Sequence, residues 1–120
     1  MIEENQTDVA GSVFRIDKFV VPPLAMDEFA ARVRQTHELL RRQPGFVRDL
    51  ILEQASGPGE FNVVTMVEWQ AQEAIDKARP VVMAMHESHG FDPQALMKRL
   101  GIRADIGNYR RVPAGLSLQD

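Results

Sequence analysis

Three histidines are the side chains of this chain best suited to acid–base chemistry. His86 and His89 stand three positions apart, so on one helix they would be neighbours that could share a site. His37 stands alone in an earlier segment. Because a histidine titrates near neutral pH, it can remove a proton from a phenol or bind a metal ion. We predict His86 or His89 as the catalytic base and His37 as a substrate-binding residue, with a structural role in the core as the alternative for any single histidine.

The same histidines do not make a metal motif. The sequence His86-Glu87-Ser88-His89 offers two ligands without an identified carboxylate partner, and the HExxH pattern is absent. The chain contains no cysteine, which excludes disulfides, thiolate nucleophiles and Cys-ligated zinc or iron–sulfur centres. It also lacks a P-loop, a dinucleotide fingerprint and a nucleophile elbow. We therefore expect no bound metal and no cofactor.

Three further side chains could contact a substrate. Trp69 is the only tryptophan, and it could either stack on a substrate or fill the core. Asp17 could accept a proton if the fold buries it, and Tyr109 could hydrogen-bond a bound molecule. Charged residues near them, such as Arg15, are more typical of ion pairs between strands. We predict Trp69, Tyr109 and Asp17, together with His37, as substrate-binding residues.

The charge of the chain excludes other partners. The formal net charge is −3, and the 14 basic and 17 acidic residues form no long block of one sign. Nucleic acid and anionic membranes are therefore not expected partners. The first residues are acidic and polar where a signal peptide would be basic and then apolar, and no apolar stretch reaches membrane-spanning length. We expect a cytoplasmic protein.

The elements that must position these residues follow from apolar periodicity and turn chemistry. Segments rich in β-branched and aromatic residues predict strands, and apolar spacings of three and four predict helices. Pro80 predicts a kink or restart inside the second helix, and Asp92, Pro93 and Gly101 predict the two ends of a short third helix. The predicted elements are a strand at 13–21, a helix at 25–43, strands at 46–54 and 61–69, a helix from 71 toward 90, a helix at 93–100 and a strand at 104–112.

This order, β-α-β-β-α-β with an extra short helix, predicts an α+β fold of the ferredoxin-like type with an antiparallel four-stranded sheet. The domain should span residues 13–112, between a flexible leader at 1–12 and a flexible tail at 113–120. The helices would cover one sheet face.

The other sheet face needs a cover of its own. Apolar residues such as Val47, Ile51, Val64 and Met66 would lie bare on it in a monomer. Because contiguous apolar patches usually mark an interface, we expect a homodimer formed through the sheet faces.

The sequence resembles the antibiotic biosynthesis monooxygenase family over residues 13–112. The similar pieces are VPPLAMDEF, QPGFVRDLILEQ, VVTMVEW and QAQEA. The resemblance implies a dimeric α/β barrel with a cavity between the sheet and the helices of each subunit. Trp69 matches the tryptophan that ends the third strand and borders this cavity. In oxygenases of this type an Asn four residues earlier and a Tyr six residues later help to bind substrate, whereas this chain has Thr65 and Ile75 there.

The resemblance implies three functions. The first is a cofactor-independent monooxygenase acting on a phenolic or quinol-type small molecule, because a deprotonated electron-rich phenol can itself reduce dioxygen. The second is a non-catalytic small-molecule-binding or accessory dimer, which the replaced Asn and Tyr favour. The third is haem degradation, for which relatives carry a second Trp within the second helix and a His near its end. Here Ala78 and Ser88 hold those places, with His89 beside the second.

Overall fold

The structure, a computed structural model, describes residues 11–113, and it contains one four-stranded antiparallel sheet with the strand order β2-β3-β1-β4. The predicted leader and tail lie almost entirely outside the described residues. The strands are β1 (Val13–Val20), β2 (Phe46–Glu53), β3 (Val63–Trp69) and β4 (Arg103–Tyr109). The helices are the short 3-10 turn η1 (Pro23–Ala25), then α2 (Met26–Leu40), α3 (Gln72–Ser88) and α4 (Pro93–Leu100). The predicted order of elements is confirmed.

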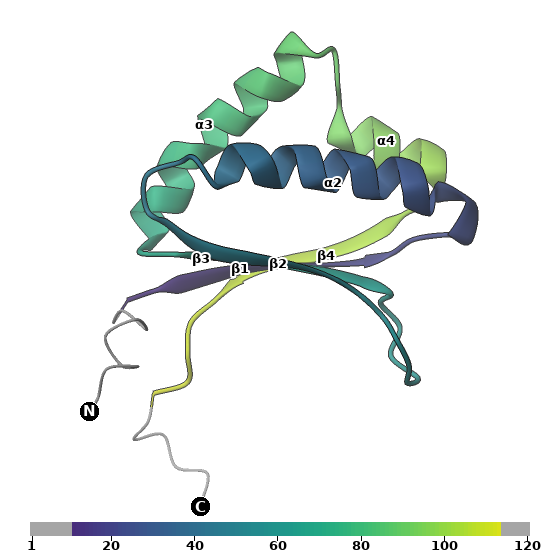
Figure 1. The fold of residues 1–120 in the computed structure, drawn as a ribbon, viewed down its shortest axis with the longest axis horizontal. Coiled ribbons are helices and arrows are strands. Elements are labelled where there is room, and N and C mark those ends of the chain that lie inside the picture. Colours follow the sequence, from purple (N-terminus) through teal and green to yellow (C-terminus); the bar gives the residue numbers. More distant parts are fainter. Residues whose placement is uncertain (1–10, 114–120) are drawn as a thin grey trace, which may run out of the picture.

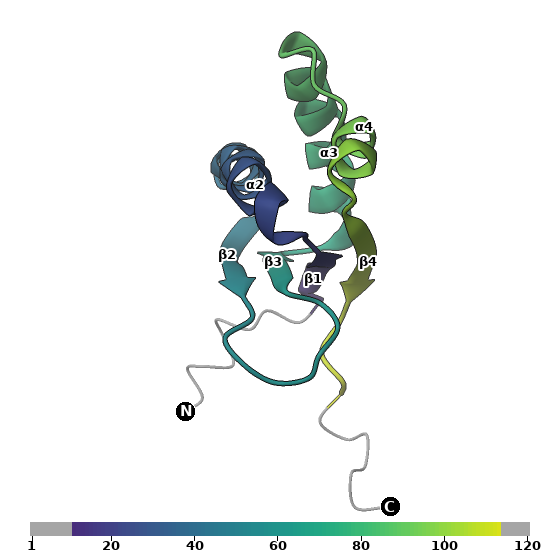
Figure 2. The same ribbon diagram turned by 90° about the vertical axis from the view of Figure 1, so that its right-hand side faces the viewer.

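All helices lie on the same side of the sheet (Figure 1). The end-on view in Figure 2 places α2 above β2 and β3, and places α3 and α4 toward β1 and β4. This two-layer arrangement confirms the predicted ferredoxin-like α+β fold. It leaves the second face of the sheet open and makes β2 and β4 the edge strands.

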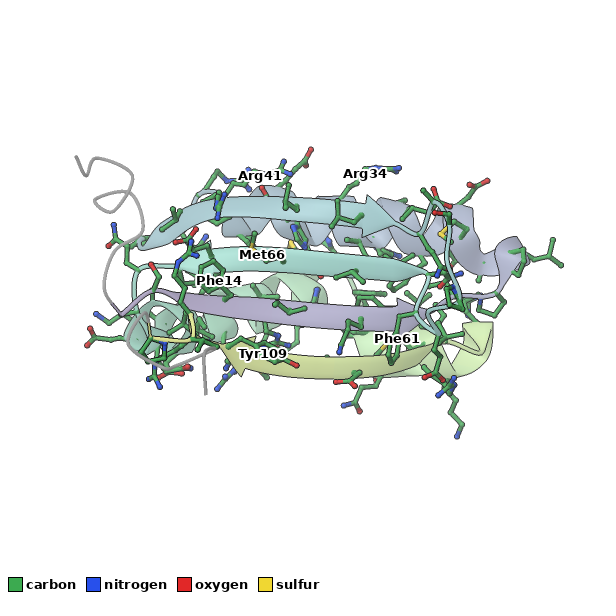
Figure 3. The ribbon with its side chains drawn as sticks, turned by 90° about the horizontal axis from the view of Figure 1, so that it is seen from below. Phe14, Arg34, Arg41, Phe61, Met66 and Tyr109 are labelled. Carbon is green, nitrogen blue, oxygen red and sulfur yellow. The ribbon has the colours of Figure 1, made fainter. Side chains whose placement is uncertain are left out.

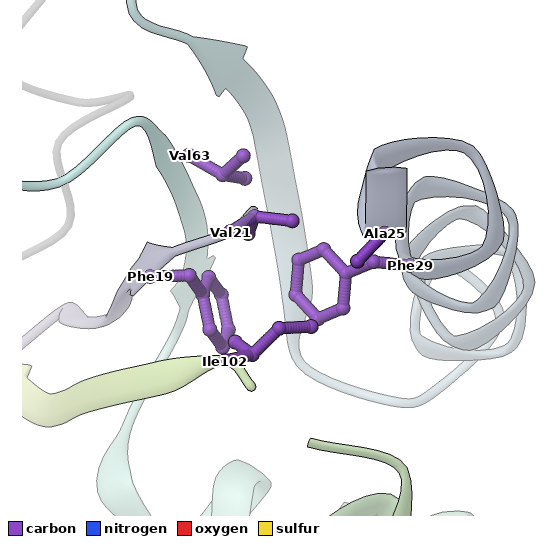
Figure 4. Packing of buried hydrophobic residues seen from close by; sticks show 6 residues of the cluster. All are labelled: Phe19, Val21, Ala25, Phe29, Val63 and Ile102. Carbon is purple, nitrogen blue, oxygen red and sulfur yellow. The ribbon is translucent and has the colours of Figure 1, made fainter. Parts of the chain in front are cut away.

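Two apolar clusters fix the helices to opposite ends of the central strands. At one end Phe19 and Val63 pair across β1 and β3, and Phe19 meets the Phe29 ring edge-on at a centroid distance of 4.8 Å. Figure 4 shows this cluster between the sheet and α2. At the other end Val13 pairs with Trp69 in a second cluster. Between the clusters the strands present smaller or polar residues to the helices, so the middle of the layer is less tightly filled.

The ends of α4 agree with the sequence signals, whereas α3 differs from one of the two alternatives that Pro80 predicted. Asp92 Oδ1 accepts hydrogen bonds from the backbone N–H groups of Gln94 at 3.0 Å and Ala95 at 3.3 Å. Gly101 ends the helix with φ at 73°, a conformation that glycine adopts without steric cost. The expectation of a helix restart at Pro80 is corrected, because α3 runs through this residue from Gln72 to Ser88.

A β-bulge in β2 changes which of its side chains face the helices. Phe46 pairs with Trp69 and Asp49 with Val67, but the register shifts between Phe46 and Arg48. The extra residue resets the alternation of side chains, so Asp49 faces the helices.

The open face of the sheet therefore has a different composition from the predicted one. Ile51 pairs with the buried Thr65, which places it on the helix side and corrects its predicted position. Val64 and Met66 alternate with Thr65 and lie on the open face as predicted, and Figure 3 shows Met66 there from below. Among residues 11–113, no helix is long and apolar enough to cross a membrane.

Candidate functional site

A cavity of ≈ 370 Å³ lies between the sheet and the helices. Its floor is formed by the helix-facing side chains of β1 and β3, and its walls come from α2, α3 and α4. Figure 2 shows α2 and α3 standing apart above the sheet. Most of the lining is apolar, including Val33, Leu40, Val67, Ile75, Ala78 and Val82. Such a cavity, with few polar groups on its wall, is typical of a small-molecule site.

Trp69 closes one end of the cavity. It is only 3% exposed and packs edge-on against Phe46 at a centroid distance of 5.9 Å, while also lining the cavity. The two predicted roles of Trp69, core packing and a wall for substrate, are therefore compatible in one position.

His37 is a buried histidine that α2 turns toward β2. Its Nδ1 lies 2.8 Å from Asp49 Oδ2. Arg41, one helical turn later, donates to the same carboxylate through Nη2 at 2.8 Å and Nε at 3.1 Å. Burial by itself raises the pKa of Asp49, but the hydrogen bonds from Arg41 and His37 hold that pKa below its usual value. Asp49 is therefore ionised at neutral pH and fixes the His37 ring, which lines the cavity.

His86 lines the cavity from the C-terminal part of α3. Its Nε2 is buried and has no hydrogen-bond partner within residues 11–113, and its ring meets Phe91 edge-on at 5.1 Å. Burial lowers the pKa of His86, and the positive charges of Arg32 and His89 lower it further. His86 is thus a neutral imidazole with an unsatisfied nitrogen.

Charged residues contribute the remaining polar part of the lining. Arg15 Nε donates to Asp17 Oδ1 at 2.6 Å, and both residues line the cavity. The sequence offered ion pairs between strands as the alternative role for such charges, whereas this pair joins two residues of β1. The guanidinium of Arg32 stacks over the Phe91 ring at 4.3 Å, next to His86.

Two predicted site residues are not brought to this cavity. His89 is the exposed C-cap residue of α3 and does not line the cavity, because the helix ends at Ser88. Tyr109 pairs with Phe14 and is 42% exposed. Figure 3 shows both residues on the open face of the sheet. The expectation that both residues belong to the site is corrected. His37, Asp17, Trp69 and His86 do line it.

Asp49 is the functional candidate that sequence reasoning missed. Strict alternation from Phe46 would place its side chain on the open face, away from His37. The only available signal was chemical, namely a carboxylate in the strand that follows the helix carrying His37.

The haem-degrading pattern does not fit these positions. His89, the histidine beside the place where relatives carry theirs, lies outside the cavity, and the first place holds the small Ala78. Within the part of the chain that the structure describes, no group of three histidine or acidic residues is arranged to hold a metal ion.

Comparisons with known proteins agree with this architecture. The sequence model described as antibiotic biosynthesis monooxygenase matches residues 12–80. No curated protein matches the chain significantly.

Several solved structures share the fold. SnoaB, a cofactor-independent oxygenase from Streptomyces nogalater, is 21% identical with a TM-score of 0.65, over 90% of this chain and 100% of SnoaB. The heme-degrader MhuD from Mycobacterium tuberculosis, solved with two hemes in its active site, is 22% identical with a TM-score of 0.63, over 84% of this chain and 96% of MhuD. A conserved protein from Methanosarcina mazei Go1 is 17% identical with a TM-score of 0.67, over 91% of this chain and 99% of that protein.

Proposed function

Because the chain belongs to the antibiotic biosynthesis monooxygenase family, we propose that it is a cofactor-independent monooxygenase acting on a phenolic or quinol-type small molecule. The observation that carries this proposal is the apolar cavity with a neutral, unsatisfied histidine on its wall. A buried polar atom without a partner is costly, so a ligand hydroxyl that completes its hydrogen bonding would bind favourably. We assign a substrate hydroxyl to His86 Nε2.

The rest of the lining suits an aromatic ring system. Trp69 and the aliphatic side chains of α2 and α3 offer an apolar surface that excludes water. A desolvated cavity strengthens the electrostatic interactions made inside it. The protein then has to bind the substrate, keep water out and accept a proton.

The substrate itself can supply the electrons for this chemistry. Loss of the phenolic proton gives an electron-rich phenolate that reduces dioxygen, and the oxygen then joins an activated ring carbon. The balanced outcome converts a phenolic C–OH group, a ring C–H group and O₂ into the two carbonyl groups of a quinone and water. The phenolic O–H bond, one C–H bond and the O–O bond are broken, the ring is oxidised and both oxygen atoms are reduced.

We propose a homodimer as the working form. Members of this family are usually dimers. Leu50 and Leu52, which are 47% and 49% exposed, adjoin Met66 and Val64 on the open face. A second copy would cover this apolar face through a self-complementary contact, with a buried area on the order of 2,000 Å².

Oxygen uptake by chelator-treated protein tests the proposed function. An oxygen electrode would follow a panel of hydroxylated polycyclic quinols, with the autoxidation rate of each subtracted. Val82→Trp fills the cavity from α3 and should abolish both uptake and substrate binding. Val81→Trp, on the neighbouring and 41% exposed position, is the matched control and should retain both.

Two results would count against this proposal. Binding of the quinols without catalysed uptake would favour the accessory dimer instead. Activity that disappears with the chelator and returns with iron would exclude cofactor independence.

A further inference from the structure

We propose that His37 is the base that takes the phenolic proton, and that Asp49 and Arg41 are positioning residues that hold it in the proton-accepting form. This inference rests on the proposed function and assigns a residue to its first chemical step. His37 is buried in the wall of the cavity, and its hydrogen bond to Asp49 comes from the side facing β2.

The hydrogen bonds around Asp49 determine which nitrogen of His37 carries the proton. An ionised carboxylate only accepts hydrogen bonds, so His37 Nδ1 must donate to Asp49 Oδ2 across the 2.8 Å contact. The neutral ring then carries its lone pair on Nε2. Arg41 holds both carboxylate oxygens through its fork of donors and thereby keeps the acceptor fixed.

Charge separates His37 from the other histidine on the wall. When His37 takes a proton, the new imidazolium lies beside the carboxylate of Asp49, which stabilises the positive charge. When His86 takes a proton, the positive charge forms next to the Arg32 guanidinium and close to His89. No carboxylate is among the groups that shift the pKa of His86. His86 is therefore the better neutral hydrogen-bonding partner, and His37 is the better base.

The proton transfer balances within the site. The substrate O–H bond breaks, its electron pair stays on the phenolate oxygen, and the proton forms a bond to His37 Nε2. After dioxygen has joined the ring carbon, the imidazolium returns its proton to the outer peroxide oxygen, which gives a hydroperoxide. The ring carbon then loses its remaining hydrogen as a proton, the electron pair of that C–H bond forms the new C=O bond, and the O–O bond breaks. The outer oxygen leaves as water with these two protons. Asp49 stays ionised throughout, as the orienting carboxylate does in serine hydrolases.

A chromogenic phenol tests the base without any turnover. The probe is 4-nitrophenol, whose ionised form is yellow, used at a pH where the free probe is mostly neutral. The wild-type protein and His89→Gln, at an exposed position that does not line the cavity, should bind it as the phenolate, whereas His37→Gln should bind it in the neutral form. Neutral probe bound to the wild-type protein, or no binding at all, would overturn the inference.

Asp49→Asn tests the positioning role at nearly constant volume. We expect kcat to fall by about 10²–10⁴-fold with little change in KM, since a misoriented base impairs proton transfer rather than binding. A long-range ¹H–¹⁵N spectrum should show the His37 proton on Nδ1 in the wild-type protein and a mixture of tautomers in the variant. A purely structural role for Asp49 would lower thermal stability but leave the tautomer unchanged, and that result would refute the assignment.

The neighbouring arginines provide a matched pair of variants. Arg41→Gln removes the two hydrogen bonds from the guanidinium to Asp49 and should lower kcat. Arg42→Gln, at an exposed position without a contact to Asp49, should not lower kcat. If no quinol is oxidised by the wild-type protein, the proposed function fails. The probe and tautomer measurements still decide on their own whether His37 accepts a phenolic proton.

Discussion

Arg48 donates a hydrogen bond from Nε to Glu68 Oε1 at 2.7 Å, across β2 and β3 on the open face of the sheet. The Glu68 side chain is 1% exposed, whereas that of Arg48 is 56% exposed. The second carboxylate oxygen, Oε2, has no hydrogen-bond partner within the described residues. A buried carboxylate thus depends on one arginine at the surface where we place the partner subunit.

Removal of this arginine should destabilise the protein. Arg48→Ala would leave the Glu68 carboxylate buried without its partner, at a cost of about 1–3 kcal/mol in the free energy of unfolding. Urea unfolding monitored by circular dichroism measures this value. Arg103→Ala is the control, because it breaks an ion pair with Glu60 whose members are both more than half exposed, and it should cost less than about 1 kcal/mol. Equal effects of the two changes would contradict the prediction.

Met66→Glu should prevent association of two copies. The change places a charge in the middle of the open face, where burial against a partner is costly. Light scattering should give twice the chain mass of 13.5 kDa for the wild-type protein and the single chain mass for the variant. Leu24→Glu, at a fully exposed position of the η1 turn, should remain dimeric. A wild-type protein that is monomeric at micromolar concentration would contradict the proposed homodimer.

Trp69 should affect both stability and substrate binding. Trp69→Ala removes a buried ring that packs on Phe46, and we expect a loss of roughly 3–5 kcal/mol in the free energy of unfolding. Trp69→Phe retains most of the packing but changes the wall of the cavity, so it should mainly raise KM. Urea unfolding and steady-state oxygen uptake on the same two variants separate the effects. An unchanged KM in Trp69→Phe would argue against contact with substrate.

His86 should make the folded state sensitive to acid. Its pKa in the folded protein is lower than the ordinary value of 6.5, so the unfolded chain binds more protons around that pH. The free energy of unfolding therefore falls as the pH is lowered through 6.5 toward the folded pKa, and the contribution is fully present above 6.5. Urea unfolding at about pH 5 and about pH 8 should show a smaller difference for His86→Gln than for the wild-type protein. Identical differences would disprove this.

The sequence was sufficient for the fold because local and global signals agree. Pro22 and Pro23 follow the first strand, Gly45 precedes the second, and Asp92 and Gly101 delimit α4, all through backbone preferences that do not depend on distant contacts. Pro80 is the exception. Packing of Ile75 and Ala78 in the cluster around Trp69 keeps α3 continuous through a residue that removes one helical hydrogen bond.

The site was only partly predictable, because it depends on the facing of individual side chains. A helical pattern does not distinguish His86 from His89. The end of α3 at Ser88 does, because His86 still lies within the helix and lines the cavity, whereas His89 follows the last helical residue. Tyr109 belongs to the edge strand β4. Alternation alone does not determine which face of the sheet its side chain occupies, because this depends on the register of β4 with β1. Asp49 was missed because the bulge after Phe46 exchanges the sheet faces that the following side chains of β2 occupy.

The bulge also makes the composition of the site sensitive to how one strand pairs. If β2 paired with β3 without the bulge and with all its residues kept, Asp49 would turn outward, while Arg48 and Leu50 would turn toward the helices. A side chain that now orients a histidine would become part of the open face of the sheet. A shift of one residue in the pairing can therefore transfer a side chain from the cavity to the opposite face without altering the fold.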